Sequence, residues 1–492
     1  MSTFGGLNTA YTGLIAARKG LEVVGQNIAN ANTQGYTRQR ITTSSVDAIS
    51  RVGLMSAGVQ AGQGVNVDGV ARLGSAQLDA QVRSSAAVAG YSAVRSNALT
   101  AVEGSMNEPG KNGLSAQLDE FWAGWHDVSN SAGDAAPAGV LLGQAAVLTT
   151  QIHQGFQAVA NQWSTTRGSV DGMVSEINNA AEQVAALNVQ IRNAQTAGGG
   201  ANELLDKRNL LTTTLAALTG GTLVDRGDGT VDVLVGGNAL VTGDSAQKLV
   251  AVGARTLAEG GPAVHVEWAG KPAAGPVAVD GGELAGAISL LAPAVTSGAG
   301  KGTGGALAEA AESYNTFAKD LADKVNAIHR TGSVSSAPNA VAGLDFFSYD
   351  PTNAAASLAV VPTTAAGIAT GTPGVGAADG SNADKLAQLG AGKAVASAGP
   401  PPTFVQSPSA DWSNFVTGFA VKTRTELQHA SLADITSNAA VGAQLANASV
   451  DLDEENVNLL MFQHAYQGAA RVMTAVDEML DTLINRTGLV GR

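Results

Sequence analysis

The chain has 492 residues, a formal net charge of −13, a hydrophobic fraction of 45% and no cysteine. This length predicts two to four domains, the negative charge argues against nucleic acid as a partner, and the lack of cysteine excludes disulfides and thiolate metal sites. The first residues lack a basic segment before an apolar core, so we expect no cleaved signal peptide. No run of about 18 apolar residues predicts a membrane helix, so we expect no membrane partner.

A heptad pattern begins the chain. Leucine or isoleucine recurs every seven residues from Leu7 to Ile28, which predicts a long helix with an apolar stripe. Arg18 and Gly25 interrupt the second position of the heptad. Such a stripe packs either within its own domain or against neighbouring helices. The residues predicted to form its seam are Leu7, Tyr11, Leu14, Leu21 and Ile28.

The polar stretch NIANANTQGYTRQR, residues 27–40, predicts the end of this helix. Asparagine tolerates turns and Gly35 can adopt a positive φ, so we expect Gly35 to cap the helix. Arg38 and Arg40 then lie beyond the negative end of the helix dipole.

Helical patterns dominate residues 78–218. Apolar residues recur there at intervals of three and four, and glycines at 198–200 and 220–221 predict the ends of two helices. The same pattern returns in residues 307–328 and ends at Gly332. We therefore expect several long helices that pack on one another.

Extended patterns interrupt the helices at three places. Residues 222–290 change to a period of two after GDGT, residues 227–230, which predicts strands joined by a hairpin turn. Residues 41–72 favour β structure. Residues 333–410 are rich in alanine, glycine and proline, which predicts short strands and loops.

The last helical pattern is the most regular. All eight seam positions from Leu459 to Leu483 are apolar, and Asp451 and Glu454 have the spacing of a capping box. The predicted seam residues are Leu459, Phe462, Tyr466, Met473, Val476, Leu480 and Leu483. Because both ends of the chain carry a stripe that needs a partner, we expect the two terminal helices to pair.

These patterns predict an α+β multidomain fold with terminal helices paired as a coiled coil, an elongated helical bundle and inserted β-rich outer domains. The expected domains are a terminal domain of 1–40 with 450–492; a helical domain of 41–221 with 300–332 and 411–449, including the β-prone segment 41–72; a β-rich insertion at 222–299; and a β or loop segment at 333–410.

We find no catalytic, cofactor-binding or metal-binding pattern, and expect that the protein is not an enzyme. The six histidines never come within four residues of one another. DRGDGTVD, residues 225–232, lacks the closing glutamate of a calcium loop and favours a hairpin turn. LDEE, residues 452–455, could supply paired carboxylates, but a helix start explains them. FWAGWH, residues 121–126, favours core packing over a sugar-stacking platform.

Two motifs at opposite ends of the chain carry a resemblance to a known family. Residues 27–40 resemble the Asn-rich motif of the bacterial flagellar axial proteins, and SVDLDEENVNLLMFQHAYQGAARVMTAVDEMLDTLINR, residues 449–486, resembles their closing motif. GYTRQR, NELLDKRNLL (202–211), GGELAGAISLL (281–291), VNAIHRTG (325–332) and GLDFF (343–347) are most similar to the hook-associated protein 1 family. Gln34 stands where that family usually has proline, and Gly25-Gln26 where it commonly has Ser-Asn.

The motif residues that match the family fall into two sets. The N-terminal set is Asn27, Ile28, Asn30, Asn32, Gly35, Tyr36, Arg38 and Gln39. The C-terminal set is Leu452, Asp453, Glu454, Glu455, Asn458, Leu459, Ala465 and Tyr466.

The resemblance implies a structural protein that forms the first ring of the hook–filament junction, an adapter on which the second junction protein and the filament assemble. It implies self-assembly, contact with the hook protein, and export through the flagellar type III apparatus, with an export chaperone, to an extracellular position in the flagellum. The alternative within the superfamily is a hook or distal-rod protein. An exported peptidoglycan hydrolase and an adhesin are further alternatives, and neither has a visible site in the sequence.

Overall fold

The computed structural model describes residues 3–47, 62–392, 406–482 and 484. The chain forms two compact units, each built from separate stretches of sequence. Unit 1 comprises Met1–Ala86, Asn178–Gln247 and Ile435–Arg492, and unit 2 comprises Ala87–Ile177 and Lys248–Asp434. Three long helices have residues in both units: α2 (Ala76–Met106), α4 (Ala135–Thr196) and α10 (Pro408–Ala448).

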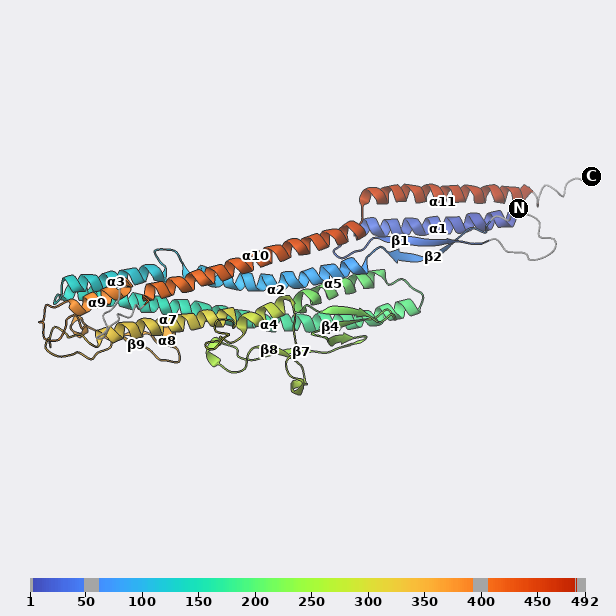
Figure 1. The fold of residues 1–492 in the computed structure, drawn as a ribbon. Helices are drawn as coiled ribbons and strands as arrows, with labels where there is room; N and C mark the ends of the chain where they lie inside the picture. The colour runs from blue at the N-terminus through green and yellow to red at the C-terminus, as the bar shows by residue number, and fades with distance from the viewer. Residues whose placement is uncertain (1–2, 48–61, 393–405, 483, 485–492) are drawn as a thin grey trace, which may run out of the picture. The chain divides into compact units, whose positions relative to one another are not determined.

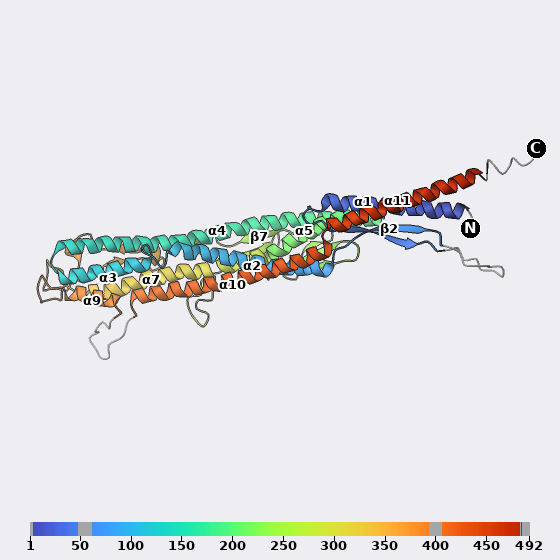
Figure 2. The ribbon, with the colours of Figure 1, turned by 90° about the horizontal axis from the view of Figure 1, so that it is seen from above.

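The terminal helices of unit 1 pack together, as the sequence predicts. Helix α1 (Thr3–Asn30) lies beside α11 (Leu452–Asp481) in both Figure 1 and Figure 2. The antiparallel strands β1 (Gln39–Ser45) and β2 (Val65–Arg72) also contact α1, and their register pairs Gln39 with Arg72 and Ser45 with Val65. Both predicted terminal helices and strands within the β-prone segment are therefore present.

Unit 1 also contains α5 (Asn202–Thr219) and a four-stranded antiparallel sheet in the order β3-β4-β5-β6. The strands are β3 (Thr222–Asp225), β4 (Val231–Val235), β5 (Asn238–Thr242) and β6 (Ser245–Ala246). Alternate valines of β4 are buried, which gives one apolar face. The buried Asn188 side chain of α4 donates to the carbonyls of Val231 and Gly243 and accepts from the Val231 N–H, so it fixes the sheet to the helix.

Unit 2 is a helical bundle with small strand pairs. Its shorter helices are α3 (Leu114–Asn130), α6 (Gly282–Leu291), α7 (Ala306–His329), α8 (Ala354–Ser357) and α9 (Ser381–Gly390). Its strands are β7 (Leu249–Val252) with β8 (His265–Trp268), and β9 (Phe347–Ser348) with β10 (Ala359–Val360). Among its described residues, 3₁₀ turns occur at Leu257–Glu259, Pro272–Ala274 and Ala365–Gly367.

Aromatic residues fill the core of unit 2. Phe121 and Trp125 of α3 pack against Phe346 and Phe347, and all four side chains are fully buried. The segment FWAGWH therefore serves core packing, and its two tryptophans are not a surface platform.

Helix α4 differs from the expectation that no segment is long and apolar enough to cross a membrane. It is 62 residues long and meets that criterion by length and composition. Its buried side chains, alanines included, recur mostly at intervals of three and four, whereas Val140 and Val147 are exposed; this one-sided pattern is that of a bundle helix. The buried row includes Leu141, Leu148, Ile152, Val159, Val170, Ile177, Val184 and Ile191.

Most predicted helix ends are confirmed. Helix α4 ends at Thr196, just before the three glycines, and α5 ends at Thr219, where the C-cap Gly220 has a left-handed φ of +69°. Gly35 has a positive φ, but the prediction that it caps the first helix is wrong, because α1 already ends at Asn30. Gly35 instead occupies the third position of a turn closed by the Tyr36 N–H and the Thr33 carbonyl.

Candidate functional site: the junction of the terminal motifs

The side chain of Asn27 joins the two terminal motifs. It lies in the last turn of α1 and is 1% exposed. Its Oδ1 accepts from the Gln39 N–H and the Tyr36 hydroxyl, at 3.0 and 2.9 Å, and its Nδ2 donates to the Gln39 carbonyl and Glu455 Oε2, at 2.9 and 3.2 Å. All its hydrogen-bonding capacity is therefore used, which explains a polar residue on the buried face of a helix.

Arg38 connects this cluster to the start of α11. Its Nε lies 2.7 Å from Glu455 Oε1, and its Nη1 lies 2.5 Å from Glu454 Oε2. Burial lowers the pKa of Arg38, but hydrogen bonds to both glutamates outweigh it and the pKa lies above its ordinary value. The backbone of Arg38 is fixed as well, because its N–H donates to the Ala448 carbonyl and its carbonyl accepts from the Leu73 N–H.

The first turn of α11 is rich in acidic residues. Asp451 is the N-cap, and its side chain accepts from the N–H groups of Asp453 and Glu454. Three acidic residues follow in the first turn, where the helix dipole favours them. The expected helix start is confirmed, but the sequence pattern did not show that Arg38 pairs with these carboxylates.

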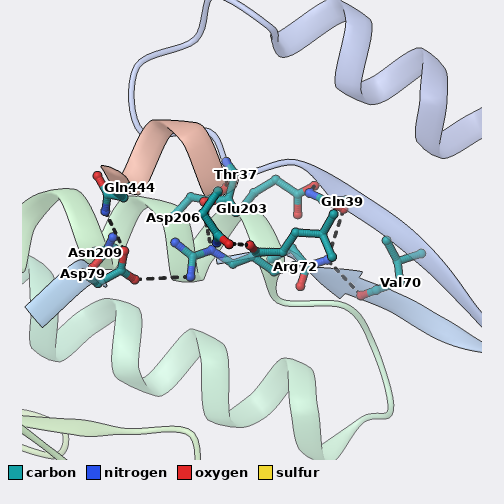
Figure 3. A network of polar contacts seen from close by, with 12 residues as sticks. Thr37, Gln39, Val70, Arg72, Asp79, Glu203, Asp206, Asn209 and Gln444 are labelled. Carbon is teal, nitrogen blue, oxygen red and sulfur yellow. Dashed lines mark hydrogen bonds and ion pairs between the residues drawn. The ribbon is translucent and has the colours of Figure 1, made fainter. Parts of the chain in front are cut away.

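A second group of polar residues, drawn in Figure 3, extends the junction to α5, β2, α2 and α10. Asp206 of α5 accepts from the Thr37 N–H at 3.0 Å and from Arg72 Nε at 2.5 Å. Arg72 also lies 3.6 Å from Asp79, which accepts from Gln444 Nε2. These contacts connect the segment after α1 directly to α5 and, through Arg72 and Asp79, to β2, α2 and α10.

Gln39 completes the connection to α5. Its Nε2 donates to Glu203 Oε1 at 3.2 Å, and its Oε1 accepts from Asn202 Nδ2 at 3.1 Å. Asn202 Nδ2 also donates to the Val70 carbonyl of β2. Asn202, Glu203 and Asp206 all lie within NELLDKRNLL, the stretch that resembles the family. That resemblance marked the stretch in the sequence, but it did not indicate that these residues contact Gln39, Thr37 and Arg72.

Tyr36 is held in the same cluster by its hydroxyl. Burial and the nearby carboxylates of Glu203, Asp206 and Glu455 raise its pKa to about 12. The protonated hydroxyl donates to Asn27 Oδ1. This arrangement needs a phenol and an amide, which matches the Asn and Tyr of the N-terminal motif.

Several small residues of α1 are buried, and one of them packs directly against α11. The buried row of α1 is Ala10, Ala16, Ala17, Gly20, Val23, Val24 and Asn27. A Cβ atom placed on Gly20 would lie 2.5 Å from the ring of Phe462, so the ring packs directly on the glycine backbone. Close packing therefore depends on the absence of a side chain at this position.

The predicted seam residues occupy several environments. Leu7, Leu14, Leu21, Ile28, Leu459, Phe462, Met473 and Leu480 are half-buried, Val476 is buried, and Tyr11 and Tyr466 are exposed. Leu483 lies outside the described residues. The half-buried leucines lie on the same helix as the row of buried small residues. Their role as seam residues stays a prediction.

The remaining motif residues serve the turn and the helix surface. Asn30 Nδ2 donates to the Gln26 carbonyl and Asn30 Oδ1 accepts from Thr33 Oγ1. Asn458 is half-buried, whereas Asn32, Leu452 and Ala465 are exposed. No group of three or more metal-ligating side chains occurs among the residues that the structure describes.

Comparisons with known proteins agree with this arrangement. Residues 99–347 match the family described as the flagellar hook-associated protein FlgK helical domain. Residues 7–37 match the flagella basal body rod protein family, and residues 444–486 match the C-terminal family of the flagellar basal body rod FlgEFG proteins. Both terminal matches include residues of the Asn27–Arg38–Glu455 cluster. Paired terminal helices joined by these motifs define a structural axial protein of the bacterial flagellum.

The central match, which covers about half of the chain, is more specific. The chain belongs to the hook-associated protein 1 (FlgK) family. It is 29% identical to flagellar hook-associated protein 1 of Bacillus subtilis over the full length of both chains. It is 31% identical to the Escherichia coli protein of the same name over 249 residues, which are 50% of this chain and 44% of that one.

A solved structure shows the same fold. The flagellar hook junction protein FlgK from Burkholderia pseudomallei aligns with a TM-score of 0.58 over 75% of this chain and 99% of its own. Its sequence identity is 14%, so the likeness concerns the fold.

Proposed function

We propose that this protein forms the first ring of the hook–filament junction and acts as the adapter on which the second junction protein and the filament assemble. Membership of the hook-associated protein 1 family supports this role. The observation that carries the self-assembly part of the proposal is the surface of the α1–α11 pair. Helix α11 buries few of its apolar side chains against α1 and leaves others exposed.

These exposed residues are large and uncharged. Leu460 and Met461 are 55% and 52% exposed, and Val457, Val472 and Met479 are similarly accessible. On α1, Tyr11 and Ile15 are exposed as well. Clustered exposed apolar residues on a helix favour contact with another protein surface. We propose that the seam residues predicted from the sequence, with these neighbours, contact adjacent copies in the ring.

The proposed partners are other copies of this chain, the hook protein and the second junction protein. We propose an extracellular position in the flagellum, reached through the flagellar type III export apparatus, with an export chaperone bound before export. The proposed domain organisation keeps residues 1–40 with 450–492 as the inner domain and places 222–299 and 333–410 outside it.

The test is to add purified, tagged protein to isolated hooks and to locate the label by electron microscopy. We expect label at one end of each hook. Label along the whole hook would favour the hook or distal-rod alternative, and unlabelled hooks would contradict the junction role.

Two variants test whether the exposed face drives assembly. Leu460→Glu places a charge on the apolar surface and should abolish end labelling while leaving the far-UV spectrum and Tm unchanged. Gln463→Glu adds the same charge at another exposed position of α11 and should retain labelling. Equal labelling by both variants would show that the exposed apolar surface of α11 does not take part in assembly.

A further inference from the structure

Two exposed methionines lie on one side of α11. Met461 and Met479 are 52% and 50% exposed. They are 18 residues apart in the same helix. This separation is about five helical turns, so both side chains leave α11 in the same direction, about 27 Å apart along its axis. The other residues at helical spacing between and beside them are exposed and uncharged, and with the two methionines they form the methionine face of α11: Val457, Ala465, Gly468, Val472 and Ala475.

These two thioethers are the most accessible oxidisable sulfur atoms in the described part of the chain. The sequence has seven methionines and no cysteine, so no thiol competes for an oxidant. Met106 is 5% exposed, and Met173 and Met473 are half-buried. All five tryptophans, the other side chains that oxidise readily, are buried. Because oxidation of sulfur follows its exposure to solvent, Met461 and Met479 should react first.

We propose that Met461 and Met479 form a reversible oxidation site that controls assembly through the methionine face. The inference rests on the proposed function, in which the exposed surface of α11 contacts adjacent copies. The oxidant is a peroxide, here hydrogen peroxide. One peroxide oxygen bonds to the methionine sulfur as the O–O bond breaks, its proton passes to the other oxygen, and that oxygen leaves as water. The sulfur is oxidised by two electrons to the sulfoxide, and the peroxide is reduced by the same two.

Oxidation changes the two methionines from apolar to polar side chains. A sulfoxide oxygen is a hydrogen-bond acceptor, and covering it without a donor costs free energy. The other residues of the methionine face are alanine, glycine and valine, which have no side-chain donor. Oxidation of the free subunit should therefore weaken its contact with a second copy. Once the face is covered by a neighbouring subunit, the same two sulfur atoms should be protected from peroxide.

The experiment treats the full chain with hydrogen peroxide and follows each methionine by peptide mass spectrometry. Met461 and Met479 should oxidise about tenfold faster than the buried Met106, which serves as the internal control. The oxidised protein is then added to isolated hooks at increasing concentrations, and end labelling is counted. Each sulfoxide should raise the concentration needed for labelling about tenfold, the effect of burying one unpaired acceptor.

Three double variants assign the effect to this face. Met461→Leu with Met479→Leu keeps the surface apolar, so it should label hooks before and after peroxide. Met461→Gln with Met479→Gln imitates the polar sulfoxide and should lose labelling without any oxidant, with an unchanged far-UV spectrum. Met106→Leu with Met173→Leu is the matched control and should remain sensitive to peroxide. Treatment of the oxidised parent with methionine sulfoxide reductases for both epimers should restore labelling.

Three results would overturn the inference. The first is oxidation of Met106 as fast as that of the two exposed methionines. The second is undiminished labelling by protein whose Met461 and Met479 are fully oxidised. The third is an equal loss of labelling after peroxide in the parent and in the double leucine variant of α11, which would place the sensitive group elsewhere. Failure of the proposed function looks different, because the untreated protein would then not label hook ends at all.

Discussion

Nε of Arg38 lies 2.7 Å from Oε1 of Glu455, and the Glu455 side chain is only 1% exposed. These residues are 417 positions apart in the sequence, and each belongs to one of the two terminal motifs. The pair therefore connects the segment after the first helix to the beginning of the last one. Asn27 contacts the other carboxylate oxygen of Glu455, so the buried charge is compensated from both sides.

Arg38→Ala should destabilise unit 1 strongly, because it leaves the buried Glu455 carboxylate without its cation. Removing one partner of a buried ion pair costs about 3–5 kcal/mol. Urea unfolding followed by circular dichroism measures the change in the free energy of unfolding. Glu454→Gln is the matched control: Glu454 pairs with the same arginine but is 60% exposed, so its loss should cost less than about 1 kcal/mol. Equal effects of the two substitutions would contradict the role of burial.

Gly20→Ala should weaken the contact between α1 and α11, because the added methyl group lies 2.5 Å from the Phe462 ring. Overpacking of this kind costs about 1–3 kcal/mol. Gly25→Ala is a control in the same helix, where a Cβ meets no atom within 4 Å. Since alanine favours helix over glycine by about 1 kcal/mol, Gly25→Ala should stabilise the protein. Tm values of both variants decide the matter, and a higher Tm for Gly20→Ala would show that the close packing is not required.

Gln34→Pro should stabilise unit 1. Gln34 and Gly35 are the central residues of the turn from Thr33 to Tyr36, and Gly35 has a φ of +79°. This is the geometry of a type II turn, which favours proline before the glycine. A compatible proline adds about 0.4–1 kcal/mol by restricting the unfolded chain.

Gly35→Ala tests the second central residue of the same turn. It should lower Tm, because alanine is strained at positive φ. If Gln34→Pro lowered Tm as well, the turn type inferred from Gly35 would be incorrect.

Protonation of His329 should destabilise unit 2 at mildly acidic pH. The ring is buried, its Nδ1 donates to the Leu344 carbonyl at 2.8 Å, and its Nε2 accepts from the Ala369 N–H at 2.9 Å. Burial lowers its pKa below the ordinary value of 6.5. Below pH 6.5 the unfolded chain therefore binds a proton that the folded chain resists, and stability falls as pH decreases through the folded pKa.

The measurement is the free energy of unfolding between pH 8 and pH 5. One such group contributes a slope of at most about 1.4 kcal/mol per pH unit. His265 acts in the opposite direction, because hydrogen bonds to Ala263 and Glu267 raise its pKa. The comparison with His329→Gln isolates the effect, since this variant should lose the downward slope below pH 6.5 that the parent shows. An identical pH dependence of parent and variant would contradict the assignment.

The sequence by itself determined most of the long helices, several of their ends and the pairing of the chain termini, but not the Gly35 end of α1 or the helices α6, α8 and α9, which lie in segments predicted as strands or loops. These features follow from local patterns: apolar residues every three or four positions, the Asp451 cap, and glycines after α4 and α5. The two terminal motifs also indicated the family. Helix position and family resemblance depend on neighbouring residues, so they are visible in the linear sequence.

Only the tertiary structure decided which faces meet and which polar residues are partners. A heptad pattern marked Leu7, Leu14 and Leu21, but it did not indicate that Gly20 packs directly against the Phe462 ring. Small residues carry little hydrophobic signal, yet they permit the shortest distance between helix backbones. The pairing of Arg38 with Glu455 joins charges from distant segments, and its strength comes from burial. Burial is a property of the packed chain, and a residue's neighbours in sequence do not reveal it.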